Sequence, residues 1–365
     1  MTAALPEPTA IPEHAEAPTV VRLRGAADVI AAVPPLLGFH PSESLVLCCL
    51  RGRRKRHCLT MRVDLPSPAQ TRGMARDLAA KARSAGADQV LVLIYTETGG
   101  GPVRRDVVLA LQDALAGQGI EVEDALRVGR GRWWAYLCEQ ESCCPSAGTP
   151  LPDTPGPGAL HLQAEMVGSG LRVHADRAQL LASIAPVGFL ARAALEQAYE
   201  LVDREIGAQL LAGEQRSVGE QTIGVCHALR ERFIAGNAQV SDREAAQVGL
   251  GLLDVRARDA VLAWAGAADC APLLAMLTQL ARKALPPAEA PVCTVLAHVA
   301  YQSGDGALAV CALDRALRSD PAYQLALLLE HALAHAVHPS VLAAAFAAPD
   351  RRAGRSRRGR GGQRP

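Results

Sequence analysis

The side-chain periodicity of this chain changes near residue 150. Before that point, short continuous apolar runs alternate with segments in which apolar residues recur every three to four positions. Short apolar runs are typical of buried strands, and the longer spacing is typical of amphipathic helices. From residue 159 on, only the helical spacing remains. We therefore expect an α/β half followed by an all-helical half, each with a core of its own.

The first half is expected to contain a mixed β-sheet with flanking helices. Turn residues follow two of the apolar runs, at Gly52 and at 129–131, and each turn predicts a hairpin. Hairpins make a sheet mixed rather than purely parallel. The expected helices span 28–37, 68–86 and 104–115. The expected strands span 45–50, 57–63, 90–95, 120–128 and 132–137.

The second half is expected to be helical throughout. One helical pair has a sharper pattern, in which small residues, a turn glycine and a closing proline fall at the spacings of a tetratricopeptide repeat (TPR): Ala297, Gly304, Ala309, Ala316 and Pro321. The sequence contains no second copy of this pattern, and arrays of such repeats need about three. An ordinary helical hairpin in a bundle remains the alternative to a TPR-like pair. The expected helices span 177–185, 188–212, 217–235, 241–254, 255–268, 271–285, 291–303, 306–318, 322–337 and 339–347.

The length of 365 residues and the local composition predict two domains with flanking segments. The predicted order is a disordered lead at 1–19, an α/β domain at 20–140, a Pro/Gly/Cys-rich linker at 141–158, a helical domain at 159–347 and a disordered Arg/Gly-rich tail at 348–365.

Charge and cysteine usage exclude some classes of partner. The net charge is +1, but residues 351–365 hold seven arginines and no acid, and subtracting these seven charges leaves −6. A mildly acidic body argues against nucleic-acid binding, except weakly through the Arg-rich tail. No apolar run reaches the roughly 18 residues of a membrane span. Ten cysteines, several inside apolar runs, favour a reducing compartment, which we expect to be the cytoplasm.

The loop 38–44 joins a helix to a buried strand and gathers polar groups. Loops at strand ends are common places for active sites. The candidate catalytic residues here are His40, Ser44 and the following acid Asp64, in a hydrolase-like relay. Gly38 and Phe39 are candidates for binding. The alternative is a structural turn whose polar groups satisfy the backbone.

Cys138, Cys143 and Cys144 form the densest thiol cluster and follow Trp133, a further binding candidate. Zinc prefers four soft ligands in a tetrahedron, and this segment supplies three. Buried structural thiols are the favoured interpretation, and a metal site or a redox pair are alternatives. On that interpretation no metal is favoured, and we expect no stoichiometric zinc in the reduced protein.

Three further patterns have a structural and a functional interpretation. Asp254 and Arg258 are spaced as a helical ion pair that, with Arg256, is a candidate for lining a groove between the halves. The basic run 51–57 is either a solvated hairpin tip or a phosphate contact. The helical spacing of His331, His335 and His338 can hold zinc, but histidines near a helix end also bond its free carbonyls.

Several blocks of the sequence resemble a known family. ADVIAAVPPLLGFHPSESLVL, RVDLP, CEQESCCPSAGTPL, DVRARDAVLAWA and GDGALAVCALDRALRSDPAYQLALLL occur in this order between about residues 20 and 341. Together they resemble the actinobacterial family catalogued as domain of unknown function 4192. The resemblance implies a cytosolic protein from a GC-rich bacterium. It assigns no activity, so no catalytic residue is carried over from it.

Two hypotheses about function follow. The first is a non-enzymatic binding or scaffold protein that docks a protein partner through its helical half. The alternative is a hydrolase-like or metal-dependent enzyme, with a site between the loop 38–44 and the segment 138–144. The glycines at 99–101 lack the Lys-Ser/Thr of a P-loop, and no dinucleotide fingerprint is present, so the sequence specifies no cofactor.

Overall fold

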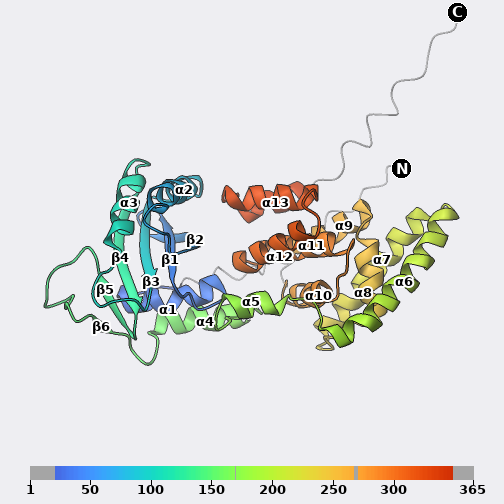
Figure 1. Ribbon diagram of the computed structural model, residues 1–365, viewed down its shortest axis with the longest axis horizontal. Coiled ribbons are helices and arrows are strands. Elements are labelled where there is room, and N and C mark those ends of the chain that lie inside the picture. Colours follow the sequence, from blue (N-terminus) through green and yellow to red (C-terminus); the bar gives the residue numbers. More distant parts are fainter. Residues whose placement is uncertain (1–20, 169, 267–269, 348–365) are drawn as a thin grey trace, which may run out of the picture.

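The computed structural model describes residues 21–168, 170–266 and 270–347. Figure 1 shows two bodies side by side, with every strand in one body and most helices in the other. We call residues 21–168 the α/β half and the described residues after them the helical half. The lead 1–19 and the tail 348–365, both expected to be disordered, lie outside the described residues.

Six strands form one mixed sheet, in the order β2-β1-β3-β4-β5-β6. β3 and β4 are parallel, and every other neighbouring pair is antiparallel. The predicted mixed sheet and both predicted hairpins, β1–β2 and β4–β5, are confirmed. The strands are β1 (Ser44–Arg51), β2 (Arg56–Asp64), β3 (Gln89–Tyr95), β4 (Glu121–Gly129), β5 (Arg132–Ala135) and β6 (Thr149–Pro150).

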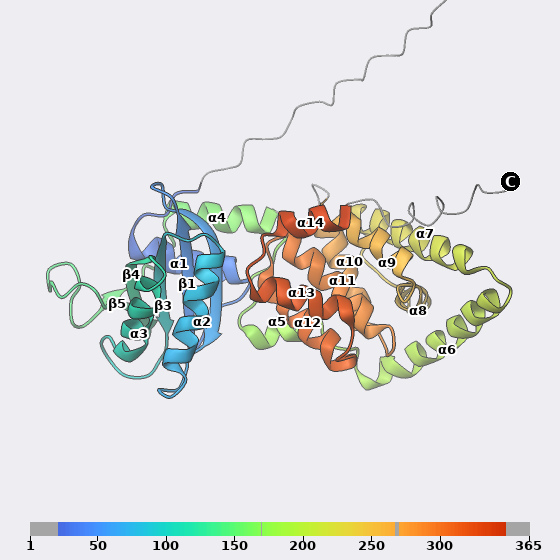
Figure 2. The same ribbon diagram turned by 90° about the horizontal axis from the view of Figure 1, so that it is seen from above.

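Helices cover both faces of the sheet. α1 (Gly25–Leu37) lies on one face, and α2 (Thr71–Ser84) with α3 (Arg105–Ala116) lies on the other (Figures 1 and 2). Alternate residues of β1 therefore enter different cores: Val46 faces the α1 side, and Leu45 faces the α2/α3 side. This two-sided burial explains why the strand is a continuous apolar run in the sequence.

The helical half contains the ten helices that the spacing predicted. Figure 2 shows the longest two, α6 and α7, at the end of the molecule far from the sheet. An additional helix that we did not predict, α4 (Pro157–Gly168), packs along α1. The others are α5 (Arg177–Ser183), α6 (Phe189–Leu211), α7 (Gln215–Ile234), α8 (Asp242–Gly251), α9 (Val255–Leu262) with a 3-10 turn (Ala263–Gly266), α10 (Ala271–Arg282), α11 (Glu289–Gln302), α12 (Gly306–Ser319), α13 (Gln324–Ala334) and α14 (Pro339–Ala347).

α11 and α12 form a helical hairpin. The small residues of the repeat-like pattern, Ala297, Ala309 and Ala316, are all buried. Gly304 turns the chain with a φ of +83°, and the carboxylate of Asp305 accepts a hydrogen bond from the N–H of Leu308 (2.9 Å) to begin α12. The hairpin is therefore built as the pattern predicted, while its likeness to a TPR pair stays a prediction.

One hydrophobic core runs through both halves. It joins residues on the α1 face of the sheet, such as Phe39 and Val46, to residues of the helical half, such as Leu180 and Leu296. The α2/α3 face has a separate core. The expectation of one core per half is therefore wrong. The sheet itself separates the two cores. α4 leads the chain back along α1 toward the helical half, so the α1 face of the sheet shares the core of that half.

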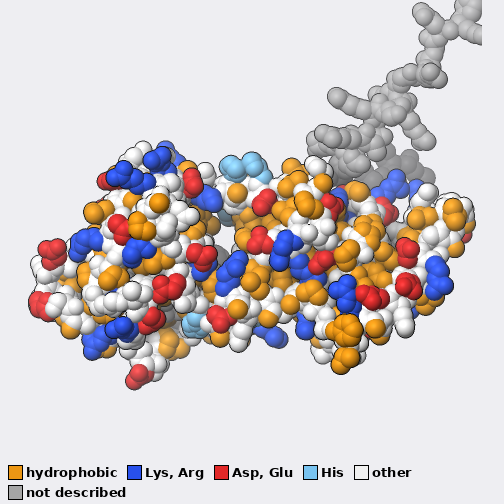
Figure 3. Space-filling model, in the orientation of Figure 1, with side chains coloured by type: hydrophobic (Ala, Val, Ile, Leu, Met, Phe, Trp, Pro, Cys, Tyr) orange, Lys and Arg blue, Asp and Glu red, His pale blue; other side chains and the backbone are white. Residues whose placement is uncertain are grey.

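The surface gives two further observations. None of the described helices combines the length and apolarity that crossing a membrane requires. On the face shown in Figure 3, acidic and basic side chains are interspersed over both halves. The charge on this face therefore does not gather into a stripe of one sign.

Candidate functional site

The segment that follows α1 lies where the two halves meet. Gly38 ends the helix with a φ of +74°, a left-handed conformation that glycine adopts at no steric cost. Its carbonyl accepts a hydrogen bond from the N–H of His174 (2.7 Å), and the carbonyl of His174 accepts one from the N–H of His40 (3.1 Å). A Cβ on Gly38 would lie 3.6 Å from the carboxylate of Asp305. This segment therefore joins the sheet to the start of α12.

The three catalytic candidates are not assembled into a relay. The side chain of His40 is exposed. Ser44 is buried, and its Oγ donates to the carbonyl of Ser42 (2.6 Å) and accepts from Nε of Arg62 (2.8 Å). The side chain of Asp64 is 88% exposed and pairs with the same arginine (2.7 Å). A serine nucleophile needs a base that a carboxylate orients, and here the hydroxyl has other partners.

The strand register separates this segment from the three cysteines. Ser44, Tyr95 and Val128 lie in register at one end of β1, β3 and β4. Beyond β5, the chain continues back along β4, where the N–H of Tyr136 donates to the carbonyl of Ala125 (2.9 Å). The cysteine segment connects this stretch to β6 at the edge of the sheet, and β3 and β4 separate it from β1. The single site that we expected between the loop 38–44 and the segment 138–144 is therefore not formed.

The aromatic binding candidates belong to the core. Phe39 is 3% exposed, and the guanidinium of Arg62 lies 5.9 Å from the centre of its ring. Trp133 is half-buried and packs against the core that both halves share. Their position gives them a packing role.

The contacts of the charged residues around the start of α9 differ from those that we expected. Asp254 caps the helix, and its carboxylate accepts from the backbone N–H of Arg256 (3.0 Å). Arg258 instead pairs with Asp259 (2.8 Å) and donates to the hydroxyl of Tyr323 (3.2 Å). The predicted ion pair between Asp254 and Arg258 is wrong, because capping turns the carboxylate toward the free N–H groups of the first turn. These contacts of Asp254 and Arg258 all lie within the helical half, and a groove between the halves lined by these residues stays a prediction.

The three histidines near α13 have local partners. The rings of His331 and His335 lie 4.1 Å apart, and Nδ1 of His335 donates to the carbonyl of His331 (2.8 Å). His338 follows the helix, and its Nδ1 lies 2.8 Å from Oγ of Ser340. The Nδ1 atoms of His335 and His338 therefore contact groups at the end of α13 and in the turn that follows it.

The three cysteines of the segment after β5 do come together. The sulfurs of Cys138, Cys143 and Cys144 all lie within 4.8 Å of one another. The sulfurs of Cys138 and Cys143 are 3.3 Å apart. Cys143 is exposed and the other two are half-buried, so the interpretation of this cluster as buried structural thiols is wrong. The buried thiols of the chain lie elsewhere, among them Cys226, Cys293 and Cys311.

The thiols differ in acidity. A hydrogen bond from the backbone of Gln140, with further ones from the two neighbouring thiols, holds the pKa of Cys138 below its ordinary value. Desolvation and the same thiol hydrogen bonds raise the pKa of Cys144 to about 12. Of these two thiols, Cys138 therefore loses its proton at the lower pH.

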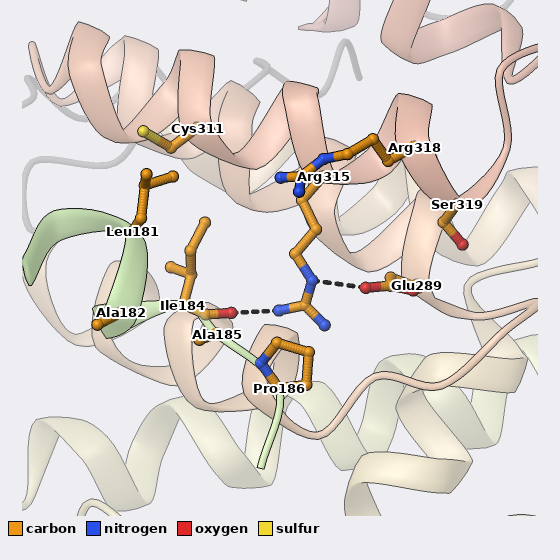
Figure 4. A pocket seen from close by; sticks show the side chains of 10 residues that line it. All are labelled: Leu181, Ala182, Ile184, Ala185, Pro186, Glu289, Cys311, Arg315, Arg318 and Ser319. Atoms are coloured by element: carbon orange, nitrogen blue, oxygen red, sulfur yellow. Dashed lines mark hydrogen bonds and ion pairs between the residues drawn. The ribbon is translucent and has the colours of Figure 1, made fainter. Parts of the chain in front are cut away.

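A pocket in the helical half was missed by the sequence analysis. It has a volume of about 420 Å³ and lies between the end of α5 and the side of α12 (Figure 4). We call it the Arg315 pocket. Its lining combines small apolar side chains with charged groups: Leu181, Ala182, Ile184, Ala185, Pro186, Glu289, Cys311, Arg315, Arg318 and Ser319.

Arg315 is the central charged group of this pocket. It is 6% exposed, its Nε pairs with Glu289 (2.6 Å), and its Nη1 donates to the carbonyl of Ile184 (Figure 4). Its Nη2 is buried and has no hydrogen-bond partner among the described residues. Arg318, one turn further along α12, is exposed. The pocket thus holds two cationic groups and one anionic group.

The signal for Arg315 was present in the sequence. It falls at the helical spacing of Leu308 and Ala312, on the face of α12 that packs inward. An arginine on an apolar helix face needs a partner, and Glu289 supplies it from the preceding helix. Because the chain contains many arginines, Arg315 did not stand out in the sequence.

A second buried arginine fixes the loop after β3. The guanidinium of Arg127 donates to the carbonyls of Thr98 (3.0 Å), Gly99 (2.8 Å) and Gly101 (2.7 Å). It also lies 4.3 Å from the centre of the Trp134 ring. The glycines at 99–101, which lack the Lys-Ser/Thr of a phosphate loop, therefore wrap an arginine of the protein itself.

Comparison with known proteins decides the family. Residues 27–340 match the family described as Domain of unknown function (DUF4192). The match spans both halves. The chain belongs to the DUF4192 family. This confirms the family resemblance that the sequence blocks carried. No curated protein and no solved structure matches the chain.

Both candidate sites lie within the DUF4192 match. The three cysteines and all residues that line the Arg315 pocket fall between residues 27 and 340, whereas the Arg-rich tail falls outside. A function of the DUF4192 region is therefore to be sought in these two sites rather than in the tail.

Proposed function

We propose that this protein is a non-enzymatic binding protein, whose helical half receives an acidic group of a protein partner in the Arg315 pocket. In this proposal it acts as a scaffold in the cytoplasm, where its ten cysteines stay reduced. The observation that carries the proposal is the presence of Arg315 and Arg318 at one pocket of about 420 Å³, which is large enough for a side chain of a partner.

Charge complementarity favours an acidic group. The lining contains two guanidinium groups and one carboxylate, so one positive charge is in excess. A carboxylate accepts charge-assisted hydrogen bonds from guanidinium groups, often two at a time. A carboxylate that accepts a hydrogen bond from Nη2 of Arg315 also removes the free-energy cost of leaving that buried donor without a partner.

Hydrophobic neighbours favour a protein as the carrier of that group. Leu181, Ile184 and Pro186 line the pocket beside the arginines. Hot spots of protein interfaces pair such apolar walls with arginine. A nucleic acid needs a broader basic surface, whereas charges of both signs are interspersed in Figure 3.

The alternative, a hydrolase-like or metal-dependent enzyme, has less support. It required one site between the loop 38–44 and the segment 138–144, and strands β3 and β4 lie between these two segments in the sheet. It also required a relay through Ser44, whose hydroxyl is bonded to Ser42 and Arg62. We therefore favour binding over catalysis.

Affinity capture with matched variants tests the proposal. The tagged full-length protein, its Arg318→Gln variant and its Arg216→Gln variant are expressed in the native cell, and the bound proteins are quantified by mass spectrometry. We expect a partner that the wild type and Arg216→Gln retain and that Arg318→Gln loses by about tenfold, equivalent to one ionic hydrogen bond.

Arg216 is the matched control because it is an exposed arginine on α7 of the same half. Binding should also weaken as salt is raised, since the contact is ionic. Equal capture by all three proteins, or a loss in Arg216→Gln alone, would contradict docking at the Arg315 pocket.

A further inference from the structure

The cysteine segment of the α/β half has the shape of a metal site. Three sulfurs lie within 4.8 Å of one another, and those of Cys138 and Cys143 are 3.3 Å apart. In a tetrahedral zinc site with Zn–S bonds of 2.3 Å, sulfurs are separated by about 3.8 Å. Because no pair of these sulfurs is separated by more than 4.8 Å, each pair is at most about 1 Å too far apart, and closing the sulfurs on one ion requires only small side-chain movements.

We propose that Cys138, Cys143 and Cys144 bind one Zn²⁺ ion through three thiolates, leaving a fourth coordination position open to solvent. The thiolate is a soft ligand, and zinc sites with three protein ligands and one open position are a recognised class. Binding converts each S–H to a Zn–S bond and releases its proton to solvent, with no change in oxidation state.

The segment is held in shape by contacts that do not involve sulfur. The carboxylate of Glu141 accepts from the N–H (3.0 Å) and the hydroxyl (3.1 Å) of Ser146. The indole N–H of Trp134 donates to the carbonyl of Ser146 (3.1 Å), and a Cβ on Gly148 would collide with that indole. The three thiols are thus brought together by the fold itself, which lowers the entropy cost of binding an ion.

Access and charge also suit a cation. Cys143 is exposed, so an ion can reach the sulfurs from solvent. Residues 138–148 contain Glu139 and Glu141 but no lysine or arginine. The guanidinium of Arg132 donates to the carbonyls of Ala147 (3.3 Å) and Gly148 (2.7 Å), so one positive charge lies against the segment, while its own two carboxylates favour a divalent ion. We expected no zinc because we interpreted the thiols as buried. The three thiols are exposed or half-buried and lie together, so that reason no longer holds.

Metal binding by the full-length, reduced, metal-free protein tests this assignment. The protein is loaded with Zn²⁺, passed through a desalting column and analysed for zinc per chain, and Co²⁺ is titrated while thiolate-to-cobalt absorption is followed. We expect close to one zinc per chain and a cobalt spectrum typical of thiolate ligands. Cys143→Ser should weaken the affinity by at least about tenfold, because it removes one of three ligands.

Cys58→Ser is the matched control. Cys58 is a half-buried thiol of β2 whose sulfur donates to the carbonyl of Cys49, outside the cluster. This variant should bind zinc as the wild type does. Because residue 143 is exposed, Cys143→Ser should keep the fold, which far-UV circular dichroism checks. Substoichiometric zinc in the wild type, undiminished zinc in Cys143→Ser, or a cobalt spectrum without thiolate bands would overturn the proposal.

Discussion

At the scale of single residues, the junction between the halves contains the carboxyl group of a half-buried aspartate. Asp305 caps α12 and lies against Gly38, and burial raises the pKa of its carboxyl to about 6. The unfolded value is about 4. The folded state therefore holds this proton more tightly than the unfolded state. The resulting contribution to stability is fully present below pH 4 and is lost as the pH rises through 6.

Asp305→Asn should flatten this part of the pH profile. Asparagine caps a helix as well as aspartate does but does not ionise. We expect the free energy of unfolding of the variant, relative to the wild type, to rise by about 1–3 kcal/mol between pH 4 and pH 7. Urea unfolding at several pH values measures it, with Asp153→Asn, at an exposed position, as the control. Parallel profiles for wild type and Asp305→Asn would be inconsistent with a raised pKa.

At the level of residues, the sequence indicated proximity only for neighbours in the chain. Cys138 and Cys143 are close in sequence, and the structure brings them together. Asp254 and Arg258 also have the right spacing, but the start of a helix at Asp254 redirects the carboxylate. Arg315 was missed because its partners, Glu289 and the carbonyl of Ile184, are distant in the sequence.

At the scale of elements, the sequence pattern predicted five of the six strands as continuous apolar runs, and nearly all helices from apolar faces that repeat every 3.6 residues. The two-residue strand β6 lies in the segment 141–158 that we expected to be a linker. Among the helices, α4 is the exception. Its Leu160 and Val167 remain exposed in the structure, so its apolar residues do not form a single inward stripe. What periodicity cannot predict is which faces meet, since that depends on the path of the chain. The shared core illustrates this limit.

The loop between β3 and α3 should depend on one arginine. Arg127 is fully buried and donates to three carbonyls of that loop. Arg127→Met leaves those carbonyls without a donor, which should cost about 2–4 kcal/mol. Proteolysis within residues 97–103 should become at least about tenfold faster, as followed by mass spectrometry. Arg76→Met, an exposed change on α2, is the control, and equal cleavage rates would refute this role.

At the scale of the whole molecule, the core shared by the two halves should make them unfold together. Trp133 and Trp134 lie in the α/β half and Trp264 in the helical half, so Trp264→Phe limits the fluorescence to the α/β half. Circular dichroism at 222 nm mainly reports the helical half. In this variant, both signals should share one urea midpoint, because neither half can lose its side of the core alone. Two separate midpoints would show that the halves are independent.

The shared core also bears on the proposed function. The Arg315 pocket lies beside the segment 184–187, which continues from the junction with the sheet into α6 (Figures 2 and 4). A partner docked there contacts the α5 end and the α11–α12 hairpin together. The α/β half then supports the position of α5 through the common core, so both halves serve one binding surface.

The most direct test of this account is to locate the partner on the surface. A photo-reactive amino acid replaces Ser319 at the rim of the Arg315 pocket, and a second protein carries it at exposed Arg216 on α7. After irradiation in the native cell, we predict a cross-link from position 319 to a residue next to an aspartate or glutamate of one partner, and none from position 216. Cross-links from position 216 alone, or none from position 319 to the captured partner, would contradict the central claim.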